Sequence, residues 1–355
     1  MLLRWAKMIC AEIQPSSTGI NHDDMGRQTC SSRAYSRRNS VFLFREFILS
    51  TYGEYLFSNK NGDNYCSATD VDQPIVLDMA GGKGNLSWLL ENVDCIQSVI
   101  FDPRLSSHIH LEKSVHYLLQ HPTEASQRSI PDQPTHQPLA TLLLQHSNVT
   151  TKRRPKQVRI HVTDHLVQAL HKEVATKKQQ FLRGDCSIER RDSSWSEYIY
   201  DALAFADATE KSNNMTLPKN NLECVDKMAT VSLNSDAGAG ECISDPQVIF
   251  DIFNRAKLIV GFHPDQATES CIDLANLLGI PFAICPCCVF PKEFPNRSYL
   301  GNKVIHYDEF LEYLKAKPSI ATTKVAKLKT IKGTSRNIVL YSLPTLGKAT
   351  ELNTL

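Results

Sequence analysis

Long apolar runs are missing from this chain, and so is an excess of charge of either sign. No apolar stretch approaches the roughly 20 residues of a membrane-spanning helix, so no membrane segment is predicted. Lysine and arginine number 39 against 38 aspartates and glutamates, a net charge of +1, which gives no overall field for nucleic acid but leaves room for a local basic face. No coiled-coil heptad or extended apolar patch indicates an oligomer.

Signals for export are also weak. The first eight residues are too short and too poorly patterned for a secretory signal, and although arginines lie among serines in residues 27–38, Asp23 and Asp24 argue against a mitochondrial transit segment. The eleven cysteines are an odd number without the rhythm of a disulfide framework, and three of them crowd into residues 285–288. We therefore expect reduced thiols in a cytoplasmic or nuclear protein.

Composition divides the 355 residues into a polar start, a patterned region and a polar insertion within it. Residues 1–38 are polar and weakly periodic, and we expect disorder or weak order there. Residues 39–355 alternate strand and helix patterns and predict one α/β domain. Its interruption at about residues 180–245 is rich in Ser, Asn, Asp, Glu and Lys, which predicts a largely disordered surface excursion, with one short helix around Trp195.

A glycine-rich turn between a strand and a helix stands out in the first half of the chain. Residues 75–77 have the pattern of a strand buried on both faces, and Asp78 stands at its carboxyl end. Residues 86–90 continue with the leucine spacing of a helix. The glycines between them, which leave no Cβ to keep a ligand from the backbone, are Gly81, Gly82 and Gly84. Strand ends of this kind bind ligands in open α/β sheets.

A second predicted strand, residues 97–101, ends at Asp102, about 20 residues past the glycines, where an acid typically binds ribose hydroxyls. The dinucleotide fingerprint G-x-G-x-x-G fits poorly, because Ala80 occupies the first glycine position and Ser87 the last. Asp78 would repel a pyrophosphate but suits a cationic sulfonium that carries an ammonium group. We therefore expect a sulfonium nucleoside; a dinucleotide, or a turn that binds nothing, are the alternatives.

The second half of the chain predicts further strands at residues 256–262 and 280–284, each between helical patterns. Residues 324–330 and 337–343 flank a Lys-Gly-Thr turn at 332–334, which favours an antiparallel hairpin. Together with a third strand at 157–162, this alternation suits a seven-stranded, mostly parallel sheet with helices on both faces and a C-terminal antiparallel hairpin.

The glycine turn with its two acids resembles motif I of the class I S-adenosylmethionine-dependent methyltransferases, with Asp102 in the ribose-binding position. The resemblance implies a Rossmann-like sheet and S-adenosyl-L-methionine as the cofactor. It also places Asp164, after the third strand, near the adenine, although helix capping by Asp164 or Thr163 is favoured over that role. The cofactor-binding residues it implies are Asp78, Ala80, Gly81, Gly82, Gly84, Asp102 and Asp164.

Two further motifs lie at the ends of the fourth and fifth predicted strands, His263-Pro264-Asp265 and Cys285-Pro286-Cys287-Cys288. Parallel strands bring these ends to the sheet edge that carries the glycine turn. With the segment Ala267-Thr268-Glu269, they are similar to the group of this family that includes the tRNA acceptor-stem 2′-O-ribose methyltransferases. Pro264-Asp265 departs from that group's pattern. The resemblance implies an RNA acceptor, tRNA in particular, and hence a place in tRNA processing; protein is the alternative acceptor.

Methyl transfer by in-line displacement needs an acceptor atom held about 3 Å from the methyl group, and a hydroxyl or amine acceptor also needs a base. His263 titrates near working pH and is the predicted base, with Asp265 to orient it or to hold an acceptor amine. Capping of the next helix is the alternative role for His263. Cys285, Cys287 and Cys288 could form a zinc site together with His263, but the C-x-C-C spacing is poor for a tetrahedral site, so we expect buried thiols and no metal.

Two function classes follow from these residues. The first is a methyltransferase that acts on RNA or protein. The second is a non-catalytic binding or scaffold protein on the same fold, which Ala80 and the polar insertion favour. A nicotinamide-dependent oxidoreductase is a third interpretation, and it needs a dinucleotide that the glycine turn fits poorly.

Overall fold

The computed structural model describes residues 30–57, 74–108, 111, 154–183, 193–216, 241–319, 321–328 and 337–344. Most of the predicted N-terminal segment, up to residue 29, and the predicted turn at 332–334 lie outside these residues.

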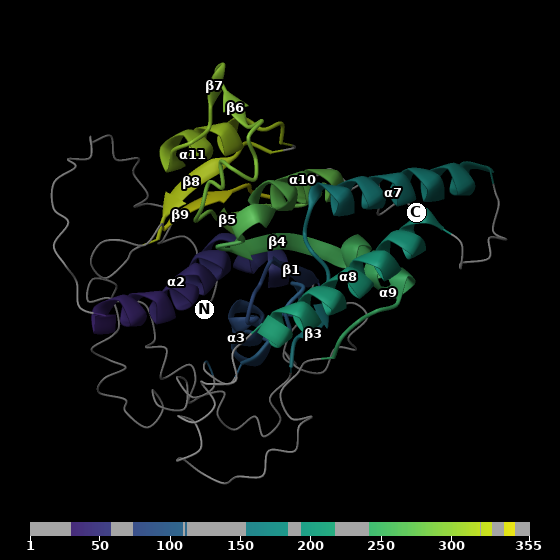
Figure 1. Cartoon of the computed structure of the whole chain (residues 1–355), viewed down its shortest axis with the longest axis horizontal. Coiled ribbons are helices and arrows are strands. Elements are labelled where there is room, and N and C mark those ends of the chain that lie inside the picture. Colours follow the sequence, from purple (N-terminus) through teal and green to yellow (C-terminus); the bar gives the residue numbers. More distant parts are fainter. Residues whose placement is uncertain are drawn as a thin grey trace, which may run out of the picture.

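Seven strands form one sheet in the order β3-β2-β1-β4-β5-β9-β8 (Figure 1). The strands are β1 (Ile75–Met79), β2 (Ser98–Phe101), β3 (Lys156–Val158), β4 (Ala256–Phe262), β5 (Phe282–Cys285), β8 (Lys324–Lys327) and β9 (Ile338–Tyr341). The first five run parallel to one another, whereas β9 runs antiparallel to both of its neighbours, β5 and β8. The predicted α/β class, the mostly parallel sheet and the antiparallel pair at its end are confirmed.

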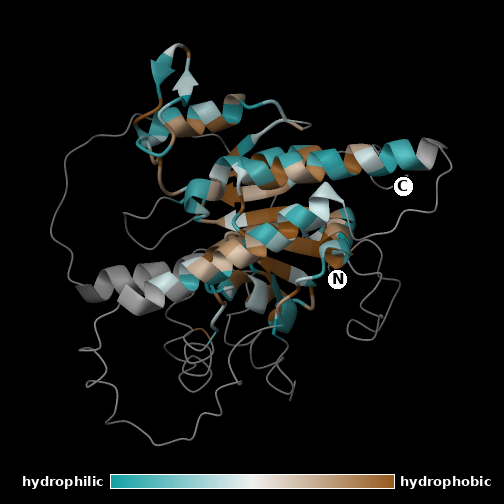
Figure 2. Ribbon diagram, turned by 45° about the vertical axis from the view of Figure 1, so that its right-hand side comes forward, coloured by the Kyte–Doolittle hydropathy of each residue, from teal (hydrophilic) through white to brown (hydrophobic). Residues whose placement is uncertain are grey.

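Helices cover both faces of this sheet, and Figure 2 shows its brown, apolar strands between helices that carry teal, polar outer surfaces. One face is covered by α7 (Asp164–Arg183), α8 (Ser194–Thr216), α9 (Pro246–Arg255) and α10 (Thr268–Leu278). The other face is covered by α2 (Cys30–Phe57) and α3 (Asn85–Val93). Two further helical elements are the 3-10 helix η2 (Asp265–Ala267) and α11 (Tyr307–Ala316).

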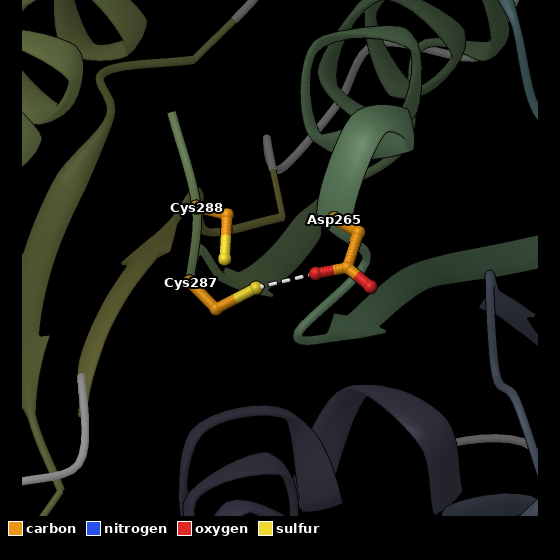
Figure 3. A group of neighbouring side chains, drawn as sticks. All are labelled: Asp265, Cys287 and Cys288. Carbon is orange, nitrogen blue, oxygen red and sulfur yellow. Dashed lines mark hydrogen bonds between the residues drawn. The ribbon is translucent and has the colours of Figure 1, made fainter. Parts of the chain in front are cut away.

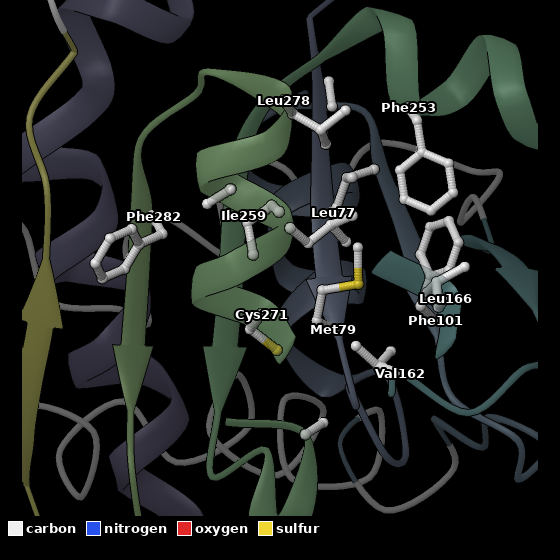
Figure 4. Packing of buried hydrophobic residues seen from close by; sticks show 14 of the residues in the cluster. Leu77, Met79, Phe101, Val162, Leu166, Phe253, Ile259, Cys271, Leu278 and Phe282 are labelled. Carbon is white, nitrogen blue, oxygen red and sulfur yellow. The ribbon is translucent and has the colours of Figure 1, made fainter. Parts of the chain in front are cut away.

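The alternation of side chains along β1 produces these two layers. Ile75, Leu77 and Met79 face the core under α7 to α10, while Val76 faces the core under α2 and α3. Figure 4 shows the first core, where Leu77 and Met79 lie among apolar side chains from the neighbouring strands and from α10. Because both faces exclude water, β1 is apolar at every position except Asp78, and that carboxyl group is only 1% exposed.

The polar stretch at 180–245 contains a long ordered helix, α8, where the sequence predicted one short helix in a largely disordered excursion. The aromatic cluster explains its order. Trp195 is 2% exposed, its ring packs edge-on against Phe250 and Phe253 of α9, and its Nε1 donates a hydrogen bond of 2.8 Å to the Pro246 carbonyl oxygen. Burial of one large aromatic ring thus fixes a segment whose composition is otherwise polar.

Buried polar side chains of α2 form hydrogen bonds with the sheet near β5 and β9, and an ion pair with the end of α3. The Tyr52 hydroxyl lies 2.8 Å from the Phe282 carbonyl oxygen and 2.9 Å from that of Ser342, between β5 and the chain beyond β9. Arg45 forms a buried ion pair with Asp94 at the end of α3. These contacts hold α2 against the sheet in addition to its apolar face.

A two-stranded hairpin, β6 (Ser298–Tyr299) with β7 (Asn302–Lys303), lies outside the main sheet and was not predicted (Figure 1). Its turn residues Leu300 and Gly301 have φ of 49° and 81°, the left-handed pair that tight hairpins require. No helix within the described parts of the chain is long and apolar enough to cross a membrane.

Candidate functional site

The glycine turn after β1 follows a left-handed path. Ala80, Gly82 and Gly84 have φ of 52°, 58° and 71°. A Cβ on Gly84 would lie 2.3 Å from Ile100 Cδ1, so only glycine fits there. Ala80 adopts the backbone that a glycine accepts freely, at a cost of about 1 kcal/mol, and its N–H donates to the Phe101 carbonyl oxygen at 2.8 Å. The substitution of alanine for the first glycine therefore leaves the turn intact.

Asp78 lies directly beneath this turn. A Cβ on Gly81 would come within 2.8 Å of the Asp78 carboxyl carbon, so the backbone rests on the carboxyl group. The Ser87 hydroxyl donates to Asp78 Oδ2 at 2.8 Å, whereas Oδ1 is buried without a partner among the described residues. Burial raises the pKa of Asp78 to about 7, and the charge of Asp102 adds to the rise while Ser87 opposes it. The sequence predicted an acid at this strand end, and the structure shows one that titrates near neutrality.

Asp102 joins the end of β2 to the glycine turn. Its Oδ2 accepts a hydrogen bond of 2.8 Å from the Gly82 N–H. Its Oδ1 accepts from the backbone N–H and from Nε of Arg104, at 2.9 and 3.0 Å. The structure thus brings the predicted ribose-binding acid and the glycine turn into direct contact. The Arg104 side chain is 73% exposed, so this partner of Asp102 can move away at little cost.

Gln157, which the sequence analysis did not select, fixes the loop that carries Asp102. Its amide Nε2 donates to the carbonyl oxygens of Asp102 and Arg104 at 2.9 and 2.6 Å, and its Oε1 accepts from the Ser106 N–H at 3.0 Å. Gln157 is fully buried in β3. A lone glutamine within a predicted strand was the available signal, because a buried amide in a sheet needs partners of this kind.

Asp164 begins α7, and its carboxylate accepts a hydrogen bond of 2.7 Å from the Ser270 hydroxyl of α10. The Thr163 carbonyl oxygen accepts the first helical bonds, from Leu166 and Val167. Thr163 therefore stands in the capping position, and Asp164 links two helices. An adenine contact by Asp164 remains a prediction.

The segment after β4 is strained at two residues. His263 and Asp265 have φ of 56° and 50°, a left-handed backbone that is costly for residues with side chains. The His263 N–H donates to the Cys285 carbonyl oxygen at 3.1 Å, and its ring stacks on Phe262 with centroids 4.3 Å apart. The Thr268 hydroxyl donates to the Asp265 carbonyl oxygen at 2.7 Å. These bonds fix the ends of β4 and β5 against each other.

The side chain of Asp265, after β4, is in contact with the cysteine motif that follows β5. The Cys287 thiol donates to Asp265 Oδ1 at 2.8 Å, and Cys288 turns its sulfur toward the same place (Figure 3). Burial, and then Asp265 and Cys288, raise the pKa of the Cys287 thiol. Cys285 lies apart from the group and is buried in the core, as predicted, whereas Cys287 and Cys288 are only half-buried. The carboxylate of Asp265 therefore engages a thiol, a contact that sequence spacing did not predict.

Acidic and basic side chains lie together at the edge of the sheet where these strands end. The hydrogen bond and the charge of Asp102 raise the pKa of Arg104, and the charge of Asp265 adds to this, so Arg104 lies within electrostatic reach of both acids. Glu269, the acid of the Ala-Thr-acid segment, instead pairs with Arg297 and Lys317 on the side of α11. The site therefore consists of the glycine turn, Asp102, Arg104 and the loop at Asp265.

No model of a protein family, no curated protein and no solved structure matches this chain. The assignment of a function therefore depends on the geometry of the site.

Proposed function

We propose that this chain is an S-adenosylmethionine-dependent methyltransferase with a Rossmann-like, class I architecture. The observation that carries the proposal is the contact between the Asp102 carboxylate and the Gly82 N–H, 2.8 Å apart at the carboxyl edge of the sheet. An acid after the second strand, against a glycine turn after the first, is the arrangement that nucleoside-binding sheets use for ribose. The antiparallel β9 beside β5 agrees with the closing hairpin that the resemblance implies.

The residues of the edge fit the parts of this cofactor. Asp102 would accept the ribose hydroxyls once Arg104 turns outward, and Gly82 has no side chain on the side of the turn that faces Arg104. Asp78, buried and able to ionise near neutral pH, favours a cation above it. The bound cofactor supplies an activated methyl group, and the protein has to hold the acceptor in line with it.

His263 is the proposed base for a hydroxyl or amine acceptor. It lies at the end of β4, its backbone is held by the Cys285 carbonyl oxygen, and its ring is held by Phe262. A ring fixed in this way can take a proton at one orientation without losing side-chain freedom in the reaction. Asp265 stands two residues on and would hold a positively charged or proton-donating part of the acceptor.

RNA, and tRNA in particular, is the proposed acceptor. Lys83 and Arg104 are exposed, and the Lys83 carbonyl oxygen accepts from Ser107 N–H at 3.2 Å, so both cations belong to this edge. Such a pair suits the phosphates of an RNA backbone, whereas a protein acceptor would need no cation there.

Calorimetry with S-adenosylhomocysteine tests the proposal, with Asp102→Asn as the variant and Asp201→Asn on the exposed face of α8 as the control. Wild type and the control should bind one equivalent. Asp102→Asn should bind roughly 10- to 100-fold more weakly, because hydrogen bonds to a charged group contribute about 1.5–3 kcal/mol. No binding by wild type, or equal binding by Asp102→Asn, would contradict the proposal. Transfer of labelled methyl to fractionated RNA and protein then identifies the acceptor.

One observation favours the alternative of a non-catalytic scaffold: Arg104 bonds to the carboxylate that the ribose would need. The variant Arg104→Ala separates the two functions. If the ion pair only covers a working site, S-adenosylhomocysteine binds Arg104→Ala at least as tightly as wild type. If neither protein binds it, the scaffold function gains.

A further inference from the structure

We infer that Asp265, Cys287 and Cys288 form a binding site for a soft divalent metal ion, with zinc as the ion that best suits their chemistry. The inference differs from the expectation of buried thiols without metal, and it assigns Asp265 to the metal in place of the acceptor contact proposed above. It does not depend on whether the chain binds a methyl donor. Its basis is the position of three side chains from two different loops.

The ligand atoms already lie together. One ligand atom from each of the three residues falls within 4.8 Å of the others, and Cys287 Sγ is 2.8 Å from Asp265 Oδ1 (Figure 3). In a tetrahedral zinc site, with Zn–S of about 2.3 Å and Zn–O of about 2.0 Å, neighbouring ligand atoms are about 3.5–3.8 Å apart. The observed group brackets these separations, so small side-chain rotations complete the geometry.

The backbone holds both loops in place by bonds that do not involve the three side chains. Thr268 Oγ donates to the Asp265 carbonyl oxygen at 2.7 Å, and the Tyr307 hydroxyl donates to the Pro286 carbonyl oxygen at 2.9 Å. The left-handed residues Asp265 and Phe290 flank the group on its two loops. Each such residue costs of order 1 kcal/mol or more, and strain of this kind collects at functional sites. The site is therefore preformed.

The chemical type and the number of the ligand atoms indicate which metal ion the site would prefer. Two sulfurs favour zinc and other soft ions over magnesium or calcium, which prefer oxygen. Two thiolates and one carboxylate give the occupied site a net charge of −1, and Arg104, within electrostatic reach of Asp265, offsets it. Three protein ligands are also the number found in catalytic zinc sites, where a fourth position stays open to water or substrate. Asp265 is exposed, and Cys287 and Cys288 are partly so, which leaves the group open to solvent.

The spacing of the cysteines in the sequence did not indicate this group of three ligands. The ligand set considered from the sequence combined the three cysteines with His263, but Cys285 ends β5 and its thiol is fully buried in the core. The group in the structure instead takes Asp265 from the loop after β4, 22 positions before Cys287 along the chain. That pairing exists only because β4 and β5 are neighbours in the sheet.

Metal titration of the reduced, full-length protein tests the inference. We expect one equivalent of Zn²⁺ per chain, bound with release of the two thiol protons to the buffer. Co²⁺ in place of Zn²⁺ should show a thiolate-to-cobalt charge-transfer band. Cys287→Ser and Asp265→Asn should each weaken Zn²⁺ binding by roughly tenfold or more, since even changes to groups behind a ligand cost about 10- to 100-fold.

Cys242→Ser, at an exposed cysteine on a different part of the chain, is the matched control and should bind as wild type does. Asp265→Asn alters an exposed side chain and keeps its shape, so it reports on the site even if Cys287→Ser fails to fold. Substoichiometric zinc in the reduced wild type, or unchanged affinity in Asp265→Asn, would overturn the inference. S-adenosylhomocysteine binding, measured on the same preparation, reports separately on the proposed function.

Discussion

The Asp78 carboxyl group lies where its charge is least favourable, within a strand that is buried on both faces. Hydrogen bonding from Ser87 does not offset the loss of water, and the pKa is raised to about 7. A carboxyl group with this pKa is half-protonated at neutral pH. A cation bound above the turn would draw it into the charged form, which makes the residue responsive to ligand.

Asp78 should make stability depend on pH between about 4 and 7. In that window the folded protein keeps a proton that the unfolded chain releases, so the free energy of unfolding falls as pH rises, by up to about 4 kcal/mol in total. Above pH 7 both states are ionised and the dependence ends. Urea unfolding at pH 5 and pH 8 should show a smaller difference in Asp78→Asn than in wild type; equal differences would contradict this assignment.

The sequence predicted residues that can be recognised by their type and their place in a motif. It missed residues whose roles depend on where the fold places them. Asp102 and the glycines were recognisable from their order alone. Gln157 and Arg104 were not, because their roles arise from the loop after β2 folding back on β3. The partnership of Asp265 with Cys287 was hidden for the same reason.

At the scale of elements, β4 spans the predicted 256–262, because a buried parallel strand with a helix on each side leaves a clear apolar run. The predicted strand at 157–162 is shorter, since the Ile160 N–H bonds to the Val158 carbonyl oxygen and bends the chain away. The hairpin β6–β7 was missed because strands of two residues show no periodicity. Helix α8 was underestimated because one aromatic cluster outweighs its polar composition.

Tyr52 connects three elements, and its loss should weaken them together. Tyr52→Phe keeps the buried ring but leaves the carbonyl oxygens of Phe282 and Ser342 without the hydroxyl proton. We expect a loss of about 1–3 kcal/mol in the free energy of unfolding, measured by urea denaturation. Tyr200→Phe, on the exposed surface of α8, is the control and should be neutral. A neutral Tyr52→Phe would show that α2 is held by its apolar face alone.

At the scale of the whole molecule, the site draws on strand ends that are far apart in sequence and adjacent in the sheet. Asp78 lies near the end of β1, and Asp102 and His263 follow β2 and β4; the three strands are neighbours in the sheet. The sequence predicted this convergence from the rule for parallel sheets. The sequence could not predict the distances between these side chains, because they depend on the conformation of the turns between strand and helix.

Hydrogen exchange should show the same convergence when ligand binds. With S-adenosylhomocysteine, amide exchange should slow by roughly tenfold or more in residues 80–84 and 102–106, because binding stabilises the bonds that join these segments. The hairpin at 298–303 lies outside the main sheet and should exchange as before. Protection confined to the hairpin, or spread evenly over the chain, would contradict the proposed binding edge.

The position of β9 between β5 and β8 has a consequence for synthesis on the ribosome. Until residues 338–341 emerge, β5 has no partner on its outer side, although the strands before it are already made. A nascent chain paused at residue 336 would present that bare strand to other chains, which is a route to aggregation. The edge of β5 is therefore covered last, by the strand that is made last among those described.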